Sequence, residues 1–156
     1  MAKILFVCSA NRFRSVIAAG YFSFLLSNRG IEGEWQVESA GTWAIEGLPP
    51  VEDAVRFCKA KGFSIEKVRS REVNLDLMKA ADLIVVMTEG HEEALELESP
   101  QFRDKMHLLS EVCDDRRYDI PDLGENEDET VEDLGIEICA LIDKGFENIC
   151  IMAGMR

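Results

Sequence analysis

The chain has 156 residues, 47% hydrophobic and 30% charged, a composition typical of one globular domain, here expected over 1–156. Its formal net charge of −13 argues against nucleic acid as the main partner and disfavours docking on anionic membranes, because both partners need basic surface patches. The five cysteines form no Cys-x-x-Cys pair and no apolar run is long enough to span a bilayer, so we expect reduced thiols and a cytoplasmic location.

Apolar runs alternate along the chain with segments of helical period. The predicted strands are residues 3–7, 35–39, 83–87 and 105–109. The predicted helices are residues 15–29, 51–62, 74–81 and 89–97, together with one long helix from about residue 128 onward. Residues 148–152 also fit a strand, and their periodicity leaves both interpretations open.

This β-α-β-α alternation predicts a three-layer α/β/α fold with a four-stranded parallel sheet and flavodoxin-like topology. Ligands of such sheets bind at the carboxyl ends of the strands. Cys8 follows the first strand directly, and the segments after Ser39 and Met87 begin at the same edge. The stretch 114–133 contains ten Asp or Glu residues and predicts a surface loop that is either mobile or functional.

The loop after the first strand carries the most specific chemistry. Five residues separate Cys8 from Arg14 and Ser15, between a predicted strand and a predicted helix. Backbone N–H groups of such a loop and the helix N-terminus can converge on a phosphate-sized anion. This field would favour Cys8 as a nucleophilic thiolate, while Arg14 held two anion oxygens and Ser15 donated to the sulfur. The alternative interpretation is a buried cysteine beside a solvated arginine.

Three separated segments resemble the low-molecular-weight protein tyrosine phosphatase family. Residues 7–15 match its Cys-x5-Arg-Ser loop and include its asparagine at Asn11. Residues 39–42 read Ser-Ala-Gly-Thr, and residues 119–122 resemble the family's aspartate loop. The segments occur in order and span nearly the whole chain, so together they are far more specific than the loop alone.

The resemblance implies a phosphatase that acts on phosphotyrosine-type proteins or small phosphomonoesters, without a metal or cofactor. Cys8 would attack phosphorus and form a cysteinyl-phosphate, while Arg14 stabilised the equatorial oxygens. Asp122 would protonate the leaving oxygen and then activate water, with Asp119 as the second candidate for this acid. Both carboxylates could instead be ordinary members of the acidic stretch, where Leu123 replaces the family's usual proline.

The same resemblance assigns the remaining site residues. The implied phosphate-binding residues are Ser9, Ala10, Asn11, Arg12, Phe13 and Ser15. Asn11, Ser15 and Ser39 would support the loop by hydrogen bonds, although Ser39 also fits an ordinary serine at a strand end. Trp43 lies where the family has an aromatic wall of the substrate cleft, and it could stack on a phosphotyrosine ring or be an ordinary core or surface residue.

Two loop positions depart from the family. Phe13 replaces the second cysteine that in many members forms a disulfide with the nucleophile, so this route of reversible oxidation is not expected. Arg12 replaces a small residue that helps to choose between phosphotyrosine and phosphoarginine. Arg12 could line the substrate cleft and recruit a second anionic group, but we expect it to point into solvent.

Other activities are compatible with parts of this pattern. A protein arginine phosphatase would use the same residues. A thioredoxin-coupled arsenate reductase needs two further cysteines in the middle of the chain, and residues 87–97 contain none. A non-catalytic anion-binding or thiol-sensing module would follow if the acidic loop never closed over Cys8. A cysteine protease would need a nearby histidine, and neither His91 nor His107 lies in a supporting motif. The oligomeric state is left open.

Overall fold

The fold is built on one parallel sheet whose central strands are buried on both faces. The structure, a computed structural model, describes residues 1–125 and 128–154. Its strands are β1 (Ala2–Cys8), β2 (Trp35–Gly41), β3 (Leu83–Val86) and β4 (Met106–Leu108). They lie in the order β2-β1-β3-β4 and all pair in parallel, which confirms the predicted flavodoxin-like sheet.

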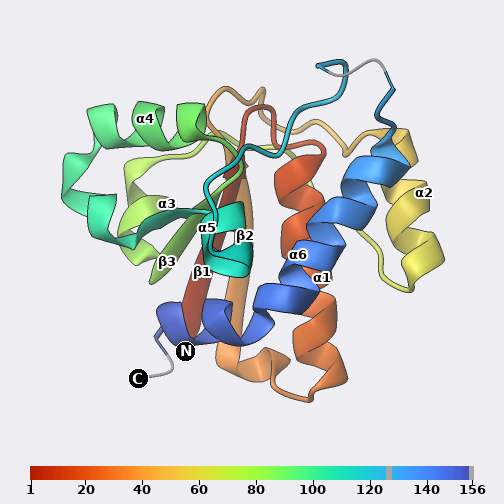
Figure 1. The fold of residues 1–156 in the computed structure, drawn as a ribbon, viewed down its shortest axis with the longest axis horizontal. Coiled ribbons are helices and arrows are strands. Elements are labelled where there is room, and N and C mark those ends of the chain that lie inside the picture. Colours follow the sequence, from red (N-terminus) through yellow and green to blue (C-terminus); the bar gives the residue numbers. More distant parts are fainter. Residues whose placement is uncertain (126–127, 155–156) are drawn as a thin grey trace.

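Helices cover both faces of this sheet (Figure 1). One face carries α1 (Arg14–Asn28), α2 (Glu52–Lys61), α5 (Leu109–Asp114) and α6 (Val131–Met152). The opposite face carries α3 (Leu75–Ala80) and α4 (Glu89–Glu98). Two 3₁₀ turns, η1 (Glu32–Glu34) and η2 (Pro100–Lys105), lead into β2 and β4. The three layers are those expected from the sequence.

Alternation along β1 explains why its sequence is apolar at every position from Ile4 to Cys8. Ile4, Phe6 and Cys8 pack into the core shared with α1 and α6, whereas Leu5 and Val7 pack into the core shared with α3 and α4. Each of these side chains is at least 98% buried, and full burial of a large apolar side chain stabilises a fold by about 2 kcal/mol. The same alternation turns Cys8 toward α1.

Two differences from the predicted elements have physical causes. The alternative strand at 148–152 is wrong, because these residues continue α6 and bury Ile149 and Cys150 against the core. The helix α5 was not predicted, since six residues are too few to show a period. Gly145 lets α6 approach α5 closely, because a Cβ there would lie 2.4 Å from the sulfur of Cys113.

The strand register brings the three carboxyl-terminal ends of β1, β2 and β3 to one edge. Val7 pairs with Ala40 of β2 and with Val86 of β3, so the residues that follow them emerge side by side. The edge formed by Cys8, Gly41 and Met87 is therefore the place where the sheet offers a ligand site.

No helix in the described part of the chain is both long and apolar enough to cross a membrane.

Candidate active site

The loop between β1 and α1 holds the predicted nucleophile beside a hydroxyl group. Cys8 is 2% exposed, and its Sγ lies 2.9 Å from Oγ of Ser15 in the first turn of α1. Phe13 precedes this helix and has no polar side chain to cap it. The first N–H groups of α1 therefore remain for an anion, and they carry the positive end of the helix dipole.

Asn11 holds the loop in its curled shape. Its backbone has a φ of 57°, in the left-handed region that asparagine tolerates better than most residues. Its Nδ2 donates to Oγ of Ser15 at 2.9 Å and to Oγ of Ser39 at 3.0 Å, and its Oδ1 accepts from the Arg71 N–H at 3.0 Å. The structure thus brings together the three expected supporting residues and adds Arg71.

Gly41 allows the chain after β2 to lie directly against the loop. A Cβ at Gly41 would be 2.2 Å from the carbonyl oxygen of Ser9, which leaves no room for any other residue. The next two N–H groups donate to the loop, from Thr42 to the Cys8 carbonyl at 2.8 Å and from Trp43 to the Ser9 carbonyl at 3.0 Å. The start of the loop backbone is therefore tied to the sheet edge.

Arg14 is a buried cation fixed by the segment that carries the candidate acids. It is 3% exposed, and its Nη1 donates to the carbonyl oxygen of Ile120 at 2.8 Å. Its Nη2 lies 3.3 Å from Oγ of Ser9 and 3.3 Å from Oδ2 of Asp122. The Ile120 N–H in turn donates to the carbonyl oxygen of Met87 at the end of β3, at 2.9 Å.

The two candidate acids have different surroundings. Asp122 forms an ion pair with Arg14, and 43% of its side chain is exposed. Asp119 instead accepts a hydrogen bond from the Glu89 N–H at 2.9 Å, at the start of α4. A carboxylate in this position stabilises the helix N-terminus. Of the two carboxylates, only that of Asp122 therefore faces Arg14.

The rim of the loop carries Arg12, Ala10 and Trp43. Arg12 is half-buried, and its Nε donates to the carbonyl oxygen of Pro49 at 2.7 Å, so part of this side chain is held at the rim. Ala10 is exposed. Trp43 is 86% exposed although its backbone is bound to the loop, so its ring is open to solvent at the rim.

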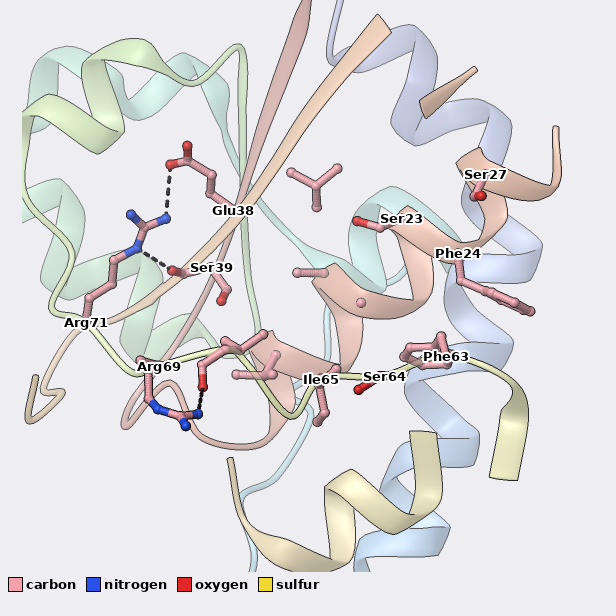
Figure 2. A pocket seen from close by; sticks show the side chains of 15 residues that line it. Ser23, Phe24, Ser27, Glu38, Ser39, Phe63, Ser64, Ile65, Arg69 and Arg71 are labelled. Carbon is pink, nitrogen blue, oxygen red and sulfur yellow. Dashed lines mark hydrogen bonds and ion pairs between the residues drawn. The ribbon is translucent and has the colours of Figure 1, made fainter. Parts of the chain in front are cut away.

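A cavity of about 580 Å³ lies along α1, the middle of β2 and residues 63–71 (Figure 2). Its basic side chains have internal partners: Arg71 binds Glu38 and the Ser39 carbonyl, and Arg69 binds the carbonyl oxygens of Glu66 and Val68. Ser39 joins this cavity to the loop through Asn11. Cys8 does not line it.

The other titratable groups do not form a second centre. Burial raises the pKa of Cys58, Cys113 and Cys139 to about 12, so these thiols stay protonated at neutral pH. All five cysteines are unbonded and buried. Across residues 1–125 and 128–154, no three His, Cys, Asp or Glu side chains gather as they would around a metal ion.

Four residues that contact the loop were not predicted from the sequence. Three are Gly41, Arg71 and Ile120, described above, and the fourth is His91, whose Nε2 lies 2.8 Å from Oγ of Ser9. Arg71 and Ile120 act through backbone atoms, which leave no residue-type signal. Gly41 lies in a segment that carried the family resemblance, but its steric role was not recognised. His91 carried one usable signal, its position three residues after a threonine at the start of a predicted helix.

Comparisons with known proteins agree with this geometry. The family model described as low molecular weight phosphotyrosine protein phosphatase matches residues 3–151. The low molecular weight protein-tyrosine-phosphatase YfkJ of Bacillus subtilis (strain 168) is 31% identical, over 96% of this chain and 94% of that protein. The protein-arginine-phosphatase of Geobacillus stearothermophilus is also 31% identical, over 94% of this chain and 95% of that protein.

A solved structure gives the same result. The low molecular weight protein tyrosine phosphatase from T. tengcongensis superposes with a TM-score of 0.85 at 30% identity, and the match covers 94% of this chain and 99% of that chain. Its coverage leaves no large part of either chain unmatched. With a family model that spans nearly the whole sequence, the chain belongs to the low molecular weight phosphotyrosine protein phosphatase family and is an enzyme of the protein-tyrosine-phosphatase type.

Proposed function

We propose that this enzyme hydrolyses phosphotyrosine on proteins through a phosphocysteine formed at Cys8. The observation that carries the proposal is that one loop holds the Cys8 thiol and the buried Arg14 guanidinium, and that the Asp122 carboxylate lies 3.3 Å from that guanidinium. A loop with a nucleophile, an anion-binding cation and a candidate acid meets the requirements of metal-free phosphoryl transfer.

The reaction has two steps in which one carboxyl group serves twice. Cys8 as a thiolate attacks phosphorus, a sulfur–phosphorus bond forms, and the phosphorus–oxygen bond to the tyrosine breaks. Asp122 gives its proton to that oxygen, so tyrosine leaves neutral. Asp122 then takes a proton from water, whose oxygen attacks phosphorus and releases inorganic phosphate and the thiolate. Arg14 and the loop N–H groups stabilise the equatorial oxygens in both steps.

Asp122 is the better candidate for the acid because its carboxylate faces the phosphate loop. The carboxylate of Asp119 accepts the Glu89 N–H at the start of α4, whereas that of Asp122 faces Arg14. This position over the loop also favours catalysis over a passive anion-binding role. Ser15 would donate its hydrogen bond to Sγ and stabilise the negative charge when Cys8 is the leaving group.

Phosphotyrosine is the favoured substrate because Trp43 offers an exposed aromatic face at the rim of the loop. Phosphoarginine is the second candidate, since the arginine phosphatase of G. stearothermophilus matches this chain with the same identity as the tyrosine phosphatase of B. subtilis. Small phosphomonoesters would also be hydrolysed. We place this activity in the cytosol.

Hydrolysis of p-nitrophenyl phosphate tests the proposal. We expect the wild type to release p-nitrophenol and Cys8→Ser to release none above background. Cys150→Ser, which removes a thiol in the last turn of α6, serves as the control and should retain activity. An inactive wild type would refute the proposed activity, and an active Cys8→Ser would refute the mechanism. Matched phosphotyrosine and phosphoarginine peptides then separate the two substrate classes by kcat/KM.

A further inference from the structure

His91 is a buried polar residue that the reaction described above does not use. It is the third residue of α4 and is only 5% exposed. Its backbone N–H donates to Oγ1 of Thr88 at 3.1 Å, and its Nδ1 accepts the Thr88 N–H at 3.2 Å. These two bonds form a capping box, in which the third position is more often Glu or Gln.

Histidine supplies a second polar atom that can donate a hydrogen bond, whereas both oxygens of a capping carboxylate only accept. In α6 the same box is made by Thr130 and Asp133, so an acidic side chain is enough to cap a helix of this chain. In His91 the second ring nitrogen, Nε2, lies 2.8 Å from Oγ of Ser9 in the phosphate loop. The cap alone therefore does not account for histidine at this position.

The direction of the bond to Ser9 follows from the cap. Nδ1 accepts an N–H and carries no proton, so the neutral ring has its proton on Nε2 and donates it to the Ser9 oxygen. Burial first, and then the positive charge of Arg14, lowers the pKa of His91 to about 4. The ring therefore stays neutral at neutral pH and keeps this one tautomer.

Ser9 passes the constraint on to the loop arginine. Its Oγ accepts from His91 and also from Nη2 of Arg14, at 3.3 Å. The two donors approach one hydroxyl oxygen, so the position of the imidazole limits where the guanidinium can lie. The same first turn of α4 also binds Asp119, and thus the aspartate loop, through the Glu89 N–H.

We propose that His91 is a positioning residue for phosphate binding, acting through Ser9 to hold the Arg14 guanidinium in the orientation that grips the anion. This inference rests on the proposed role of Arg14. The hydrogen bonds of His91 go to Thr88 and Ser9 and not to Cys8 or Asp122, so it takes no part in proton transfer. Its effect is to reduce the freedom of the group that binds substrate and transition state.

The test separates the cap from the contact with Ser9. His91→Asn keeps a side-chain acceptor for the Thr88 N–H, as Asp133 does for Thr130, but it lacks the ring atom that reaches Ser9. We expect kcat/KM to fall about 10-fold, and the inhibition constant of inorganic phosphate to rise by a similar factor, as for one lost hydrogen bond. Asp133→Asn, the same change of cap in α6, should alter neither.

A double-mutant cycle identifies the route of the effect. In a Ser9→Ala background, His91→Asn should change phosphate affinity less than twofold, because the connecting hydroxyl is already gone. Two results would overturn the proposal: a full 10-fold loss in the Ser9→Ala background, or wild-type behaviour of His91→Asn while His91→Ala is impaired. Phosphate affinity is measured without turnover, so this outcome is independent of whether Cys8→Ser abolishes hydrolysis.

Discussion

The phosphate loop and the aspartate loop meet at Arg14, but they are held in different ways. In the phosphate loop, Asn11, Arg14 and Ser15 are each at least 97% buried and hydrogen-bonded to one another or to neighbouring segments. In the aspartate loop the candidate acid, Asp122, has 43% of its side chain exposed. The anion-binding groups are therefore preorganised, whereas the acid lies where solvent and substrate can reach it.

Ile120 is the link between the two loops. Its N–H binds Met87 at the end of β3, and its carbonyl oxygen binds Arg14. One buried residue thus fixes the start of the aspartate loop while the following residues remain more accessible. The contrast indicates that the phosphate loop is the rigid half of the site, whereas the aspartate loop is the accessible half, which can admit and release substrate. Four experiments test this difference.

The largest effect is expected for Arg14→Lys. Lysine keeps the positive charge but lacks the planar fork that holds two anion oxygens and the Ile120 carbonyl together. We expect kcat/KM for p-nitrophenyl phosphate to fall about 10³-fold, comparable to losing a preorganised transition-state donor. Arg29→Lys, a change just past the other end of α1, is the control. A loss of kcat/KM of less than 10-fold would mean that the positive charge at position 14 is enough and that the fork of the guanidinium is not needed.

The second largest effect is expected for a change in the aspartate loop, the accessible half of the site. Asp122→Asn should lower kcat for a phosphotyrosine peptide about 10²-fold, because tyrosinate then leaves without a proton. The loss should be smaller for p-nitrophenyl phosphate, whose leaving group is a much weaker base. Asp119→Asn should change kcat by only a few fold, since that side chain binds the start of α4. Steady-state kinetics measure both losses, and a larger loss of kcat for Asp119→Asn than for Asp122→Asn would assign the acid to Asp119.

Asn11→Ala tests how much the rigid half contributes to stability. The substitution removes three hydrogen bonds, two buried and one partly buried, and places alanine at a φ of 57°. We expect the free energy of unfolding in urea to fall by about 3 kcal/mol. Asn11→Gly should recover about 1 kcal/mol of this, because glycine removes the backbone strain but not the lost bonds. Equal values for the two variants would show that the left-handed backbone is not strained.

The smallest of the four effects is a pH dependence at the junction of the loops. The pKa of His91 is about 4 in the folded protein and 6.5 in the ordinary imidazole, so the unfolded chain binds the proton first as the pH falls. Stability contributed by the neutral ring is complete above pH 6.5 and is lost toward pH 4, by about 2 kcal/mol between pH 7 and pH 5.

The measurement is urea unfolding of wild type and His91→Asn at both pH values. The difference between the two proteins isolates the imidazole from the many carboxylates of the chain. Arg14, which opposes protonation, and Asp119 and Asp122, which favour it, remain in both proteins. An equal loss of stability in wild type and variant would show that His91 is free to protonate in the folded state.

Most of the fold could be predicted because its signals are local and repeated. Apolar residues at every position of β3, and from Ile4 to Cys8 in β1, indicate strands buried on both faces, and glycines at 30 and 62 mark helix ends. The strand β2 continues two residues beyond its predicted end, through Ala40 and Gly41. Glycine has a low strand propensity, and here it is required by the close approach of Ser9.

Without the family resemblance, which added Ser39 and the candidate acid Asp122, the site could be predicted only as far as its side chains lie close together in sequence. Cys8, Arg14 and Ser15 share one loop, so their spacing is informative. The contacts of this loop with Arg71, His91 and Ile120 join residues that are 60, 82 and 106 positions apart. Two of these contacts use backbone atoms, whose position depends on the completed fold, and the third uses a histidine whose capping role resembles that of many helix starts.

These separations also set the order in which the site is completed during synthesis. The ribosome produces Cys8 and Arg14 long before Ile120, the residue whose carbonyl holds the guanidinium. At a synthesis rate of roughly 5–20 residues per second, the interval is about 5–20 s. Throughout that time the nascent chain carries the thiol without Ile120 and Asp122, the late partners of Arg14. Anion binding should therefore appear late and abruptly, after the aspartate loop has left the ribosome.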